Sequence, residues 1–279
     1  MLKLEQIPMR KDNYSYALIK NNSVIMVDPS EPHESLLYFS KNPHFSLEGI
    51  INTHSHMDHV GGNEILWQQW QCPIYGPDEE KDRIPYISNP LTDKEEMHVL
   101  GITISAHDVR AHTCGHMAFL VHTPLDVVIK QGHGRTSCDV RALAHHKVMF
   151  VGDSLFAGGC GRLFEGSPQN LVDCLSFYGR QDPHLLMACA HEYTKDNLSF
   201  ALKMLPDHQD IITRLNNIDD LLFKEGASIP CFFSLELKTN PFLLALTEPY
   251  TKGFAKKFGL KSNELSAVLY ALRNAKDQF

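Results

Sequence analysis

The sequence lacks several features that mark common classes of protein. No apolar run approaches the ~18 residues that a membrane-spanning helix needs, and residues 1–6 lack the apolar stretch of a signal peptide. The seven cysteines form no C-x-x-C pair, which argues against a disulfide framework and for reduced thiols. A formal net charge of -7 disfavours nucleic acid as a general partner. We therefore expect a cytoplasmic globular protein that acts neither on membranes nor on nucleic acid.

The pattern of predicted secondary structure changes at the start of the last third of the chain. A length of 279 residues allows one large domain or two modest ones. Short β-prone apolar segments dominate up to about residue 191, and helical periodicity follows, with Ile211, Leu215, Ile218 and Leu222 at spacings of 3 and 4. We predict an α/β domain over residues 1–191 and a helical domain over residues 192–279.

Local patterns predict the individual elements. Strands are expected at Tyr14 to Ile19, Val24 to Asp28, Leu47 to Asn52, Cys72 to Tyr75, His98 to Ser105, Ala118 to His122, Val127 to Lys130, Lys147 to Val151 and Leu185 to Cys189. Helices are expected at Pro32 to Ser40, Asn63 to Trp70, Gln169 to Tyr178, Lys195 to Leu205, Ile211 to Phe223, Phe254 to Phe258 and Asn263 to Lys276.

One short segment concentrates the histidines, of which the chain has 16. In the order H-x-H-x-D-H it contains His54, His56, Asp58 and His59. Residues two apart on a strand point the same way, so His54 and His56 would hold one ion, and Asp58 and His59 on the following loop would face a second. Neutral imidazole and carboxylate suit zinc, iron or manganese. This density of ligands disfavours a polar loop without a joint function.

Further candidate ligands follow apolar runs, at the strand ends where active sites of α/β sheets gather. Asp153 and His191 each close such a run, and either His112 or His116 supplies another ligand, because chemistry alone does not choose between them. The other histidines without convergent neighbours in the sequence are interpreted as surface or core residues: His98, His107, His122, His133, His145 and His146.

The order of these ligands resembles the metallo-β-lactamase superfamily, and longer segments resemble its glyoxalase II family. The matching segments are G-D-S-L-F (152–156), G-C-G-R-L-F-E-G (159–166), H-E-Y-T (191–194), T-N-P-F-L (239–243) and L-R-N-A-K-D-Q-F (272–279). The resemblance runs almost end to end and includes the helical part. Residues 116–150 match poorly, and a surface hairpin or loop insertion is expected around Lys130 to Arg135.

The resemblance implies an αββα metallo-β-lactamase sandwich with a C-terminal helical domain. It also implies the roles of single residues. His54, His56 and His112 would hold metal one; Asp58, His59 and His191 would hold metal two; Asp153 would bridge them. Glutathione would be met by Arg162, Phe164, Tyr193, Arg273 and Lys276, with Phe164 standing where the family usually has Tyr.

The implied reaction is hydrolysis of S-D-lactoylglutathione to D-lactate and glutathione, within methylglyoxal detoxification. A hydroxide shared by two divalent cations, zinc before iron or manganese, would attack the thioester, with Asp58 and Asp153 as the catalytic carboxylates. A thiolate whose parent pKa is ~8.5 leaves without a general acid, so such a site fits thioesters. The absence of G-x-S-x-G disfavours a serine nucleophile, and Cys160 is interpreted as a packed residue rather than a nucleophile.

Two other classes of function remain as alternatives. One is a mononuclear-iron persulfide dioxygenase of the same fold, which normally lacks the helical tail; the other is a metal-binding scaffold without activity. β-Lactamase and RNA-processing nuclease activities explain the chain less well, because neither accounts for Arg273 and Lys276, three apart on one helix. We expect a small-molecule glutathione thioester as the partner, with a monomer as the working prediction for oligomeric state.

Overall fold

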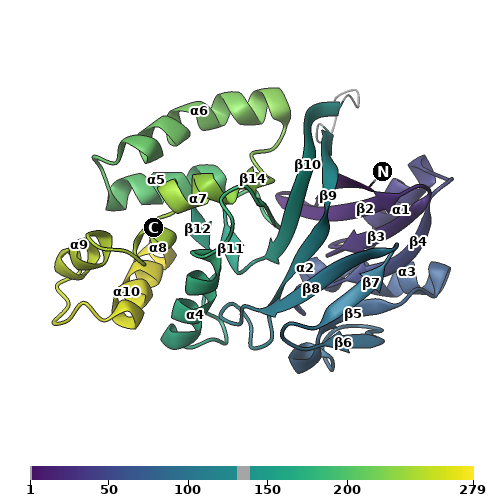
Figure 1. The fold of residues 1–279 in the computed structure, drawn as a ribbon, viewed down its shortest axis with the longest axis horizontal. Helices are drawn as coiled ribbons and strands as arrows, with labels where there is room; N and C mark the ends of the chain where they lie inside the picture. The colour runs from purple at the N-terminus through teal and green to yellow at the C-terminus, as the bar shows by residue number, and fades with distance from the viewer. Residues whose placement is uncertain (1, 131–138) are drawn as a thin grey trace.

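The computed structural model describes residues 2–130 and 139–279 (Figure 1). Its strands are β1 (Leu2–Met9), β2 (Asn13–Lys20), β3 (Ser23–Val27), β4 (Ser46–Ile51), β5 (Ile74–Pro77), β6 (Asn89–Leu91), β7 (Glu96–Val99), β8 (Ile102–Asp108), β9 (Met117–Lys130), β10 (Asp139–Gly152), β11 (Leu155–Phe156), β12 (Gly159–Cys160), β13 (Leu186–Cys189) and β14 (Cys231–Phe232). Its helices are α1 (Pro32–Lys41), α2 (Met57–Val60), α3 (Asn63–Trp70), α4 (Pro168–Tyr178), α5 (Thr194–Met204), α6 (Gln209–Glu225), α7 (Phe233–Thr239), α8 (Pro241–Leu244), α9 (Tyr250–Lys257) and α10 (Leu265–Asp277), with a 3-10 turn at Asp78–Glu80.

The long strands β9 and β10 connect the two layers of strands. In the described residues, one sheet runs in the order β14-β13-β10-β9-β1-β2-β3-β4-β5-β6. The strand β9 pairs with β8 through residues 117–121 and with β1 through residues 126–129, so the sheet branches along this strand. Side chains of both layers share one core, so the inner faces of the β1–β4 layer and the β8–β10 layer meet.

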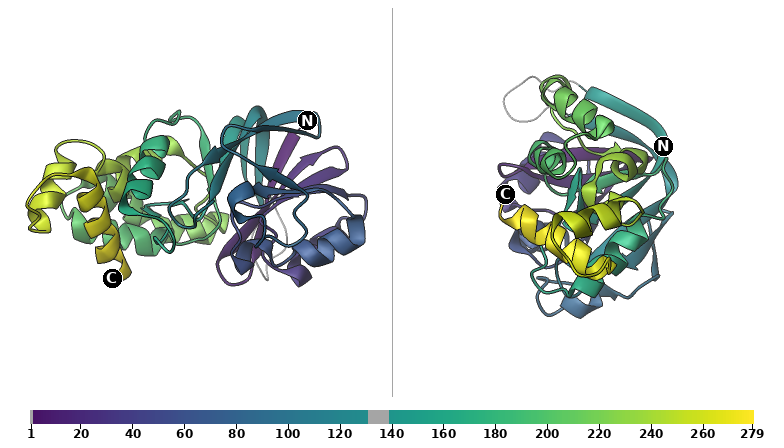
Figure 2. Two further views of the ribbon diagram at one scale, coloured as in Figure 1. Left: turned by 90° about the horizontal axis from the view of Figure 1, so that it is seen from below. Right: turned by 90° about the vertical axis from the view of Figure 1, so that its left-hand side faces the viewer.

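Alternating side chains fill two separate cores. On β2, Leu18 points into the core between the layers, where Tyr16 also packs 5.4 Å from the Phe150 ring of β10. Its neighbours Ala17 and Ile19 point the other way, into a core beneath α1 and α3. Strands buried on both faces explain the near-continuous apolar runs of the sequence. The helix α4 and the C-terminal helices lie on the side of the strands away from α1 and α3. This arrangement confirms the αββα fold with a C-terminal helical part (Figure 2).

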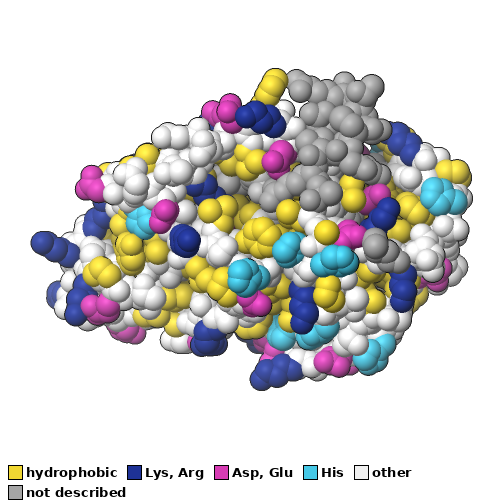
Figure 3. Space-filling model, turned by 45° about the horizontal axis from the view of Figure 1, so that its top comes forward, with side chains coloured by type: hydrophobic (Ala, Val, Ile, Leu, Met, Phe, Trp, Pro, Cys, Tyr) yellow, Lys and Arg dark blue, Asp and Glu magenta, His cyan; other side chains and the backbone are white. Residues whose placement is uncertain are grey.

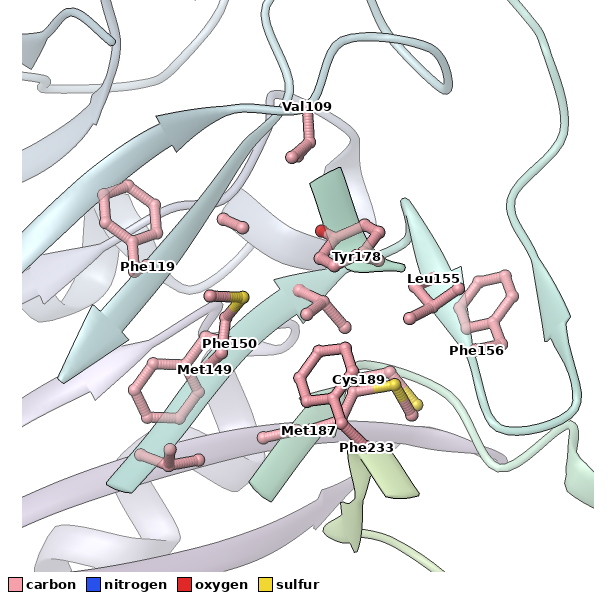
Figure 4. Close-up of a cluster of buried hydrophobic side chains, with 14 of the residues drawn as sticks. Val109, Phe119, Met149, Phe150, Leu155, Phe156, Tyr178, Met187, Cys189 and Phe233 are labelled. Atoms are coloured by element: carbon pink, nitrogen blue, oxygen red, sulfur yellow. The ribbon is translucent and has the colours of Figure 1, made fainter. Parts of the chain in front are cut away.

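A cluster of large apolar side chains fixes the ends of β10 and β13, from which two predicted ligands project. Met149 and Phe150 of β10 and Met187 of β13 pack near Tyr178 of α4 and Phe233 of α7 (Figure 4). The rings of Tyr178 and Phe233 are stacked with centroids 6.0 Å apart. A capping box at Ser167 begins the helix α4. These contacts hold the strand ends rigidly beside the helical part.

Most expected elements are confirmed, and several are corrected. Residues His98 to Ser105 form not one strand but parts of β7 and β8, which a turn at Leu100 and Gly101 separates, both with positive φ. The two expected strands between Ala118 and Lys130 are one strand, β9. The strand β1 and the helices α7 and α8 were not expected.

Two further points concern what the described residues leave open. The insertion expected at Lys130 to Arg135 lies almost entirely outside them, as does His133. Within the described ranges, no helix is long and apolar enough to span a membrane.

Candidate metal centre

The H-x-H-x-D-H segment lies in the connection after β4, at the edge where β10 and β13 also end. The strand stops at Ile51, so His54 and His56 lie on a loop; the expectation that they share a strand face is wrong. Asp58 and His59 fall on the single turn of α2 rather than on a loop. The side chains nevertheless converge, because the short helix turns the chain back toward the strand ends.

Three imidazoles meet on one side of the centre. His56 Nδ1 lies 3.0 Å from His54 Nε2 and 3.1 Å from His112 Nε2. These three ring nitrogens lie within 4.8 Å of one another, in an arrangement able to hold one metal ion. Three nitrogens that face one another so closely have no good hydrogen-bond arrangement among themselves when all three rings are neutral acceptors. A shared cation satisfies all three.

The second group joins a carboxylate to two further imidazoles. Asp58 Oδ2 lies 3.4 Å from His191 Nε2 and 3.9 Å from His59 Nε2. The ligand atoms of these three residues also lie within 4.8 Å of one another. The side chain of Asp58 is 31% exposed, whereas His59 is fully buried. Asp58 is thus the ligand candidate of this second group that solvent can reach.

Asp153 faces both groups with different oxygens. Its Oδ1 lies 3.4 Å from both His59 Nε2 and His191 Nε2, whereas its Oδ2 lies 3.6 Å from His112 Nε2. The Oδ1 of Asp153 and Nε2 of His59 are buried and have no hydrogen-bond partner. Buried polar atoms of this kind are costly unless something binds them. The donor set therefore fits divalent cations, and the seven predicted ligands come together.

Electrostatics differ between the two groups. Burial lowers the pKa of His54 and of His112, which keeps these rings in the neutral form that binds metals. Burial alone would also lower the pKa values of His59 and His191. The carboxylate of Asp153 outweighs this effect and raises both pKa values, that of His191 to about 10. The side of the centre that holds the carboxylates therefore demands positive charge, which two protons or one cation can supply.

Oxygen atoms hold the outward-facing nitrogens of the ligand rings, and sequence reasoning missed most of these partners. His59 Nδ1 lies 3.0 Å from Asp28 Oδ2, and His191 Nδ1 lies 3.1 Å from Asp12 Oδ1. Asn13 donates from Nδ2 to Asp58 Oδ2 at 3.1 Å. Such partners fix the ring orientation of metal ligands. Asp28 ends an apolar strand as Asp153 does and could have been found by that signal; Asp12, in a turn, and Asn13, the first residue of β2, follow no such run.

Gly152 sits where no other residue would fit. Its φ is +50°, and a Cβ there would lie 2.4 Å from Thr53 Oγ1 and 2.8 Å from His116 Nε2. The glycine thereby lets β10 end against the histidine loop and brings Asp153 to the centre.

Two residues that the sequence left in question have roles outside the centre. His116 Nε2 accepts from the backbone N–H of Asp153 at 3.1 Å, so this nitrogen holds Asp153 in place while His112 faces His56. Cys160 is buried, and burial raises the pKa of its thiol to about 11, which suits a packed residue and not a nucleophile. Histidines also lie on the surface (Figure 3). Of these, His107 and His122 each lie 2.9 Å from Ser105 Oγ.

A cavity of about 480 Å³ opens beside the centre. It reaches His112 and Asp153 and contains all five of the residues predicted to meet substrate: Arg162, Phe164, Tyr193, Arg273 and Lys276. A larger groove of about 590 Å³ between α6 and α7 contains none of the predicted site residues. We assign the chemistry to the smaller cavity because only it adjoins the metal ligands.

The cavity walls differ in character. Phe164 is 60% exposed, with its ring 5.2 Å from that of His112, and the Tyr193 ring is stacked on His191 at 4.8 Å. Arg162 and Lys276 supply positive charge, and burial together with the neighbouring Arg273 lowers the pKa of Lys276. The third predicted cation, Arg273, is buried and donates to Cys160 O at 2.6 Å and to Asp277 Oδ1 at 3.1 Å. A ligand with an apolar or sulfur-bearing middle and an anionic end suits these walls.

Two family profiles match this chain. The first describes the metallo-beta-lactamase superfamily and covers residues 10–191. The second describes the hydroxyacylglutathione hydrolase C-terminus and covers residues 192–279.

Individual relatives and solved structures agree with the profiles. A hydroxyacylglutathione hydrolase of Pseudomonas savastanoi pv. phaseolicola is 34% identical over 284 residues, covering 100% of both chains. One of Prochlorococcus marinus is 33% identical over 235 residues, covering 84% of this chain and 87% of its own. The crystal structure of ETHE1 from Myxococcus xanthus has a TM-score of 0.60 at 16% identity, covering 98% of this chain and 99% of that one. The BLEG-1 B3 metallo-beta-lactamase has a TM-score of 0.58 at 17% identity, covering 86% and 99%. The two structural likenesses concern the fold alone.

Proposed function

Because this chain belongs to the hydroxyacylglutathione hydrolase family, within the metallo-beta-lactamase superfamily, we propose that it hydrolyses hydroxyacylglutathione thioesters, S-D-lactoylglutathione first among them. The products would be D-lactate and glutathione. The observation that carries the proposal is the convergence of six side chains around Asp153, whose two carboxylate oxygens face separate groups of ligands.

The centre would hold two divalent cations, with zinc as the first choice. His54, His56 and His112 would hold one, Asp58, His59 and His191 the other, and Asp153 would contact both. When bound, such cations make hydroxide available near neutral pH and polarise a carbonyl oxygen. The imidazole-rich set fits zinc or iron, and the two carboxylates also tolerate manganese.

The protein's own groups would orient the attacking water and the thioester. Of the two carboxylates of the centre, Asp58 has the more exposed side chain, 31% against 10% for Asp153, and Asn13 donates to it, so Asp58 can accept a hydrogen bond from the water and direct its attack. Asp153 is held by the backbone contact to His116 and keeps its charge, since His59 and His191 lower its pKa despite burial. The departing thiolate needs no proton donor, because its parent thiol has a pKa of ~8.5.

The glutathione half would occupy the cavity. Arg162 and Lys276 supply the positive charge that its carboxylates need in a chain of net charge -7. Tyr193 and Phe164 would line its path toward the metal ligands. The division into residues 1–191 for the metal centre and 192–279 for most of the thiol-binding wall belongs to the same proposal.

Hydrolysis of a panel of thioesters by the metal-loaded protein tests this function. We expect saturable cleavage of S-D-lactoylglutathione, loss of activity after removal of metal with a chelator, and its return when zinc is added back. Metal analysis of the same samples should give two ions per chain. Full turnover in the chelated, metal-free protein would overturn the proposal. No observation favours the persulfide dioxygenase alternative, and oxygen uptake with glutathione persulfide would reveal it.

A further inference from the structure

Glu80 places a carboxylate next to the metal centre without belonging to its ligands. It ends the 3-10 turn that follows β5, and its side chain is 0% exposed. A buried carboxylate is costly unless hydrogen bonds or an opposite charge compensate it. A carboxylate in this place therefore needs an explanation from its contacts.

The two oxygens of Glu80 contact two different loops. Oε2 accepts from the backbone N–H of Ser55 at 2.7 Å, whereas Oε1 accepts from the backbone N–H of Gly115 at 2.9 Å and from Thr113 Oγ1. Ser55 lies between two imidazole ligands, and Thr113 directly follows the third. One buried carboxylate thus joins the two loops that carry the three-imidazole group: His54, His56 and His112.

Gly115 shows how closely the second of these loops approaches the carboxylate. A Cβ at Gly115 would lie 2.8 Å from Glu80 Cγ, which is well inside the usual separation of packed carbon atoms. Any other residue at this position would push the loop and Glu80 apart.

His56 is the ligand ring that depends most on this contact. In the three-imidazole group, Thr53 Oγ1 and Arg162 O lie 3.1 and 3.0 Å from the outer nitrogens of the first and third rings. The described residues give the ring of His56 no oxygen partner of this kind. Its place is therefore set by the backbone, in which the neighbouring N–H of Ser55 is held by Glu80.

Arg83 closes the outer side of the same carboxylate. Its Nη2 lies 3.5 Å from Glu80 Oε2, 3.2 Å from Glu165 Oε2 and 3.0 Å from Cys114 Sγ. Two carboxylates and a thiol that converge in this way attract a cation, and the guanidinium supplies it. This cluster therefore needs no metal ion of its own, and Arg83 compensates part of the cost of burying Glu80.

We propose that Glu80 is a positioning residue for the metal centre, whose carboxylate holds the two loops at the spacing at which the three-imidazole group binds its cation. The inference rests on the proposed function, whose centre it extends by one buried support. Asp28 and Asp12 act on the other group of ligands through the rings of His59 and His191, whereas Glu80 acts through the backbone of the loops.

Glu80→Gln tests this role with little change of shape. An amide keeps one acceptor oxygen and cannot accept from both loops, so the three-imidazole group should bind zinc ~10- to 100-fold more weakly. The other ion should keep its affinity within twofold. Competition of the zinc-loaded protein with a chelator, followed by metal analysis, should show one ion released early and one at the wild-type chelator concentration. Wild-type affinity for both ions, or equal weakening of both, would overturn the proposal.

Glu79→Gln is the matched control, because it removes a carboxylate from the same turn. The side chain of Glu79 is 62% exposed, and its carboxylate lies 3.8 Å from Arg110 Nη2. This variant should release both ions at the wild-type chelator concentrations. If it lost one ion as readily as Glu80→Gln, the effect would come from charge alone, and the positioning role would be wrong.

Thr113→Val tests the same contact from the second loop. The change keeps the shape and removes only the hydroxyl donor to Glu80 Oε1, so the loss of zinc affinity should be smaller, about two- to tenfold, and again confined to one ion. Circular dichroism of each variant shows whether it has folded, and this milder change answers the question even if Glu80→Gln does not fold. Unchanged zinc affinity in the folded valine variant would contradict the proposal.

A double variant shows which ion each support serves. Asp12→Asn removes the partner of His191, in the other group of ligands. Combined with Glu80→Gln, it should leave both ions weakened, each about as much as in the single variants. One ion of wild-type affinity in the double variant would place both residues on the same site and refute the assignment of Glu80 to the three-imidazole group.

Kinetics separate positioning from a general loss of structure. With S-D-lactoylglutathione and limiting zinc, Glu80→Gln should lower kcat and leave KM within twofold, and added zinc should restore kcat. A loss of kcat that added zinc does not restore would contradict a role in metal affinity.

Release of zinc is measured without any thioester, which keeps this inference separate from the proposed function. Early release of one ion from Glu80→Gln, in a protein whose wild type cleaves no thioester, would contradict the proposed function alone. Thioester cleavage by the wild type, with unchanged zinc release from Glu80→Gln, would contradict the positioning role alone.

Discussion

The metal centre and the cavity beside it differ in how firmly their side chains are held. Around the metal centre, an oxygen atom holds four of the five ligand rings from outside, as Asp28 holds His59 and Asp12 holds His191. Around the cavity, Phe164 and Arg162 are more than half exposed, and a single carboxylate, Asp277, holds Arg162. Under the proposed function, the chemistry is thus preorganised by buried contacts, whereas the recognition of the thiol depends on surface side chains.

This difference has a physical reason. Cations bind with geometry fixed to a fraction of an ångström, so their ligands must be oriented before binding. A flexible tripeptide makes several weaker contacts, each of which tolerates some movement. We therefore expect changes in the centre to abolish activity and changes in the cavity to alter only affinity.

The largest effect should follow from Asp153→Asn. The amide keeps the shape but removes the charge that faces both groups of ligands, so we expect fewer than two metal ions per chain and a fall in kcat of at least ~10³-fold. Metal analysis and steady-state kinetics on the same preparation measure both. Two bound ions with a normal kcat would show that Asp153 bridges nothing. The control for a lost surface charge is Asp220→Asn on the exposed surface of α6, which should keep two metal ions and the wild-type kcat.

A smaller loss should follow from Asp12→Asn, outside the ligand set. The carboxylate holds His191 Nδ1 and its loss should weaken the binding of one cation ~10- to 100-fold while the other remains. Titration of zinc into the metal-free variant, followed by calorimetry, should resolve one weakened and one normal site. Lys11→Gln in the same turn, which is exposed, should bind both ions as the wild type does. Equal weakening of both sites would contradict a role confined to His191.

The residues of the metal centre were easier to find from sequence patterns than the contacts of the cavity. Burial explains this, because the ligands that are held firmly also follow buried strands. Ligands such as Asp153 and His191 follow buried strands, and a buried strand leaves a readable apolar run before a polar residue. The contact between Arg162 and Asp277 joins residues 115 positions apart on a loop and a helix end, as their numbers show, and no local pattern records it.

Errors in the predicted elements have a local origin. The segment His98 to Ser105 has β-prone residues on both sides of Leu100 and Gly101, whose positive φ angles turn it into two strands. The single strand β9 was divided because Thr123 and Pro124 interrupt its apolar pattern. The helices α7 and α8 have only seven and four residues, so neither is long enough to show the one-sided periodicity that revealed α6.

The role of the cavity in binding is tested by Lys276→Met. The change keeps most of the side-chain volume and removes the charge, so KM for S-D-lactoylglutathione should rise about tenfold while kcat stays within twofold. Lys252→Met on α9, an exposed lysine away from the cavity, is the matched control and should leave KM unchanged. A fall in kcat comparable to that of the centre variants would mean that the two halves are not as separate as their geometry indicates.

Phe164→Tyr should have the smallest effect, and a favourable one. Phe164 is 60% exposed at the mouth of the cavity, so an added hydroxyl costs no burial and can donate to a bound tripeptide. A neutral hydrogen bond of ~0.5–1.5 kcal/mol lowers KM for the glutathione thioester about two- to tenfold. Turnover of the S-lactoyl thioester of N-acetylcysteamine should stay constant, because that substrate does not extend to the place of the tripeptide. If KM fell equally for both substrates, the ring would act on the acyl half beside His56 and His112, and Phe164 would belong to the centre and not to the cavity.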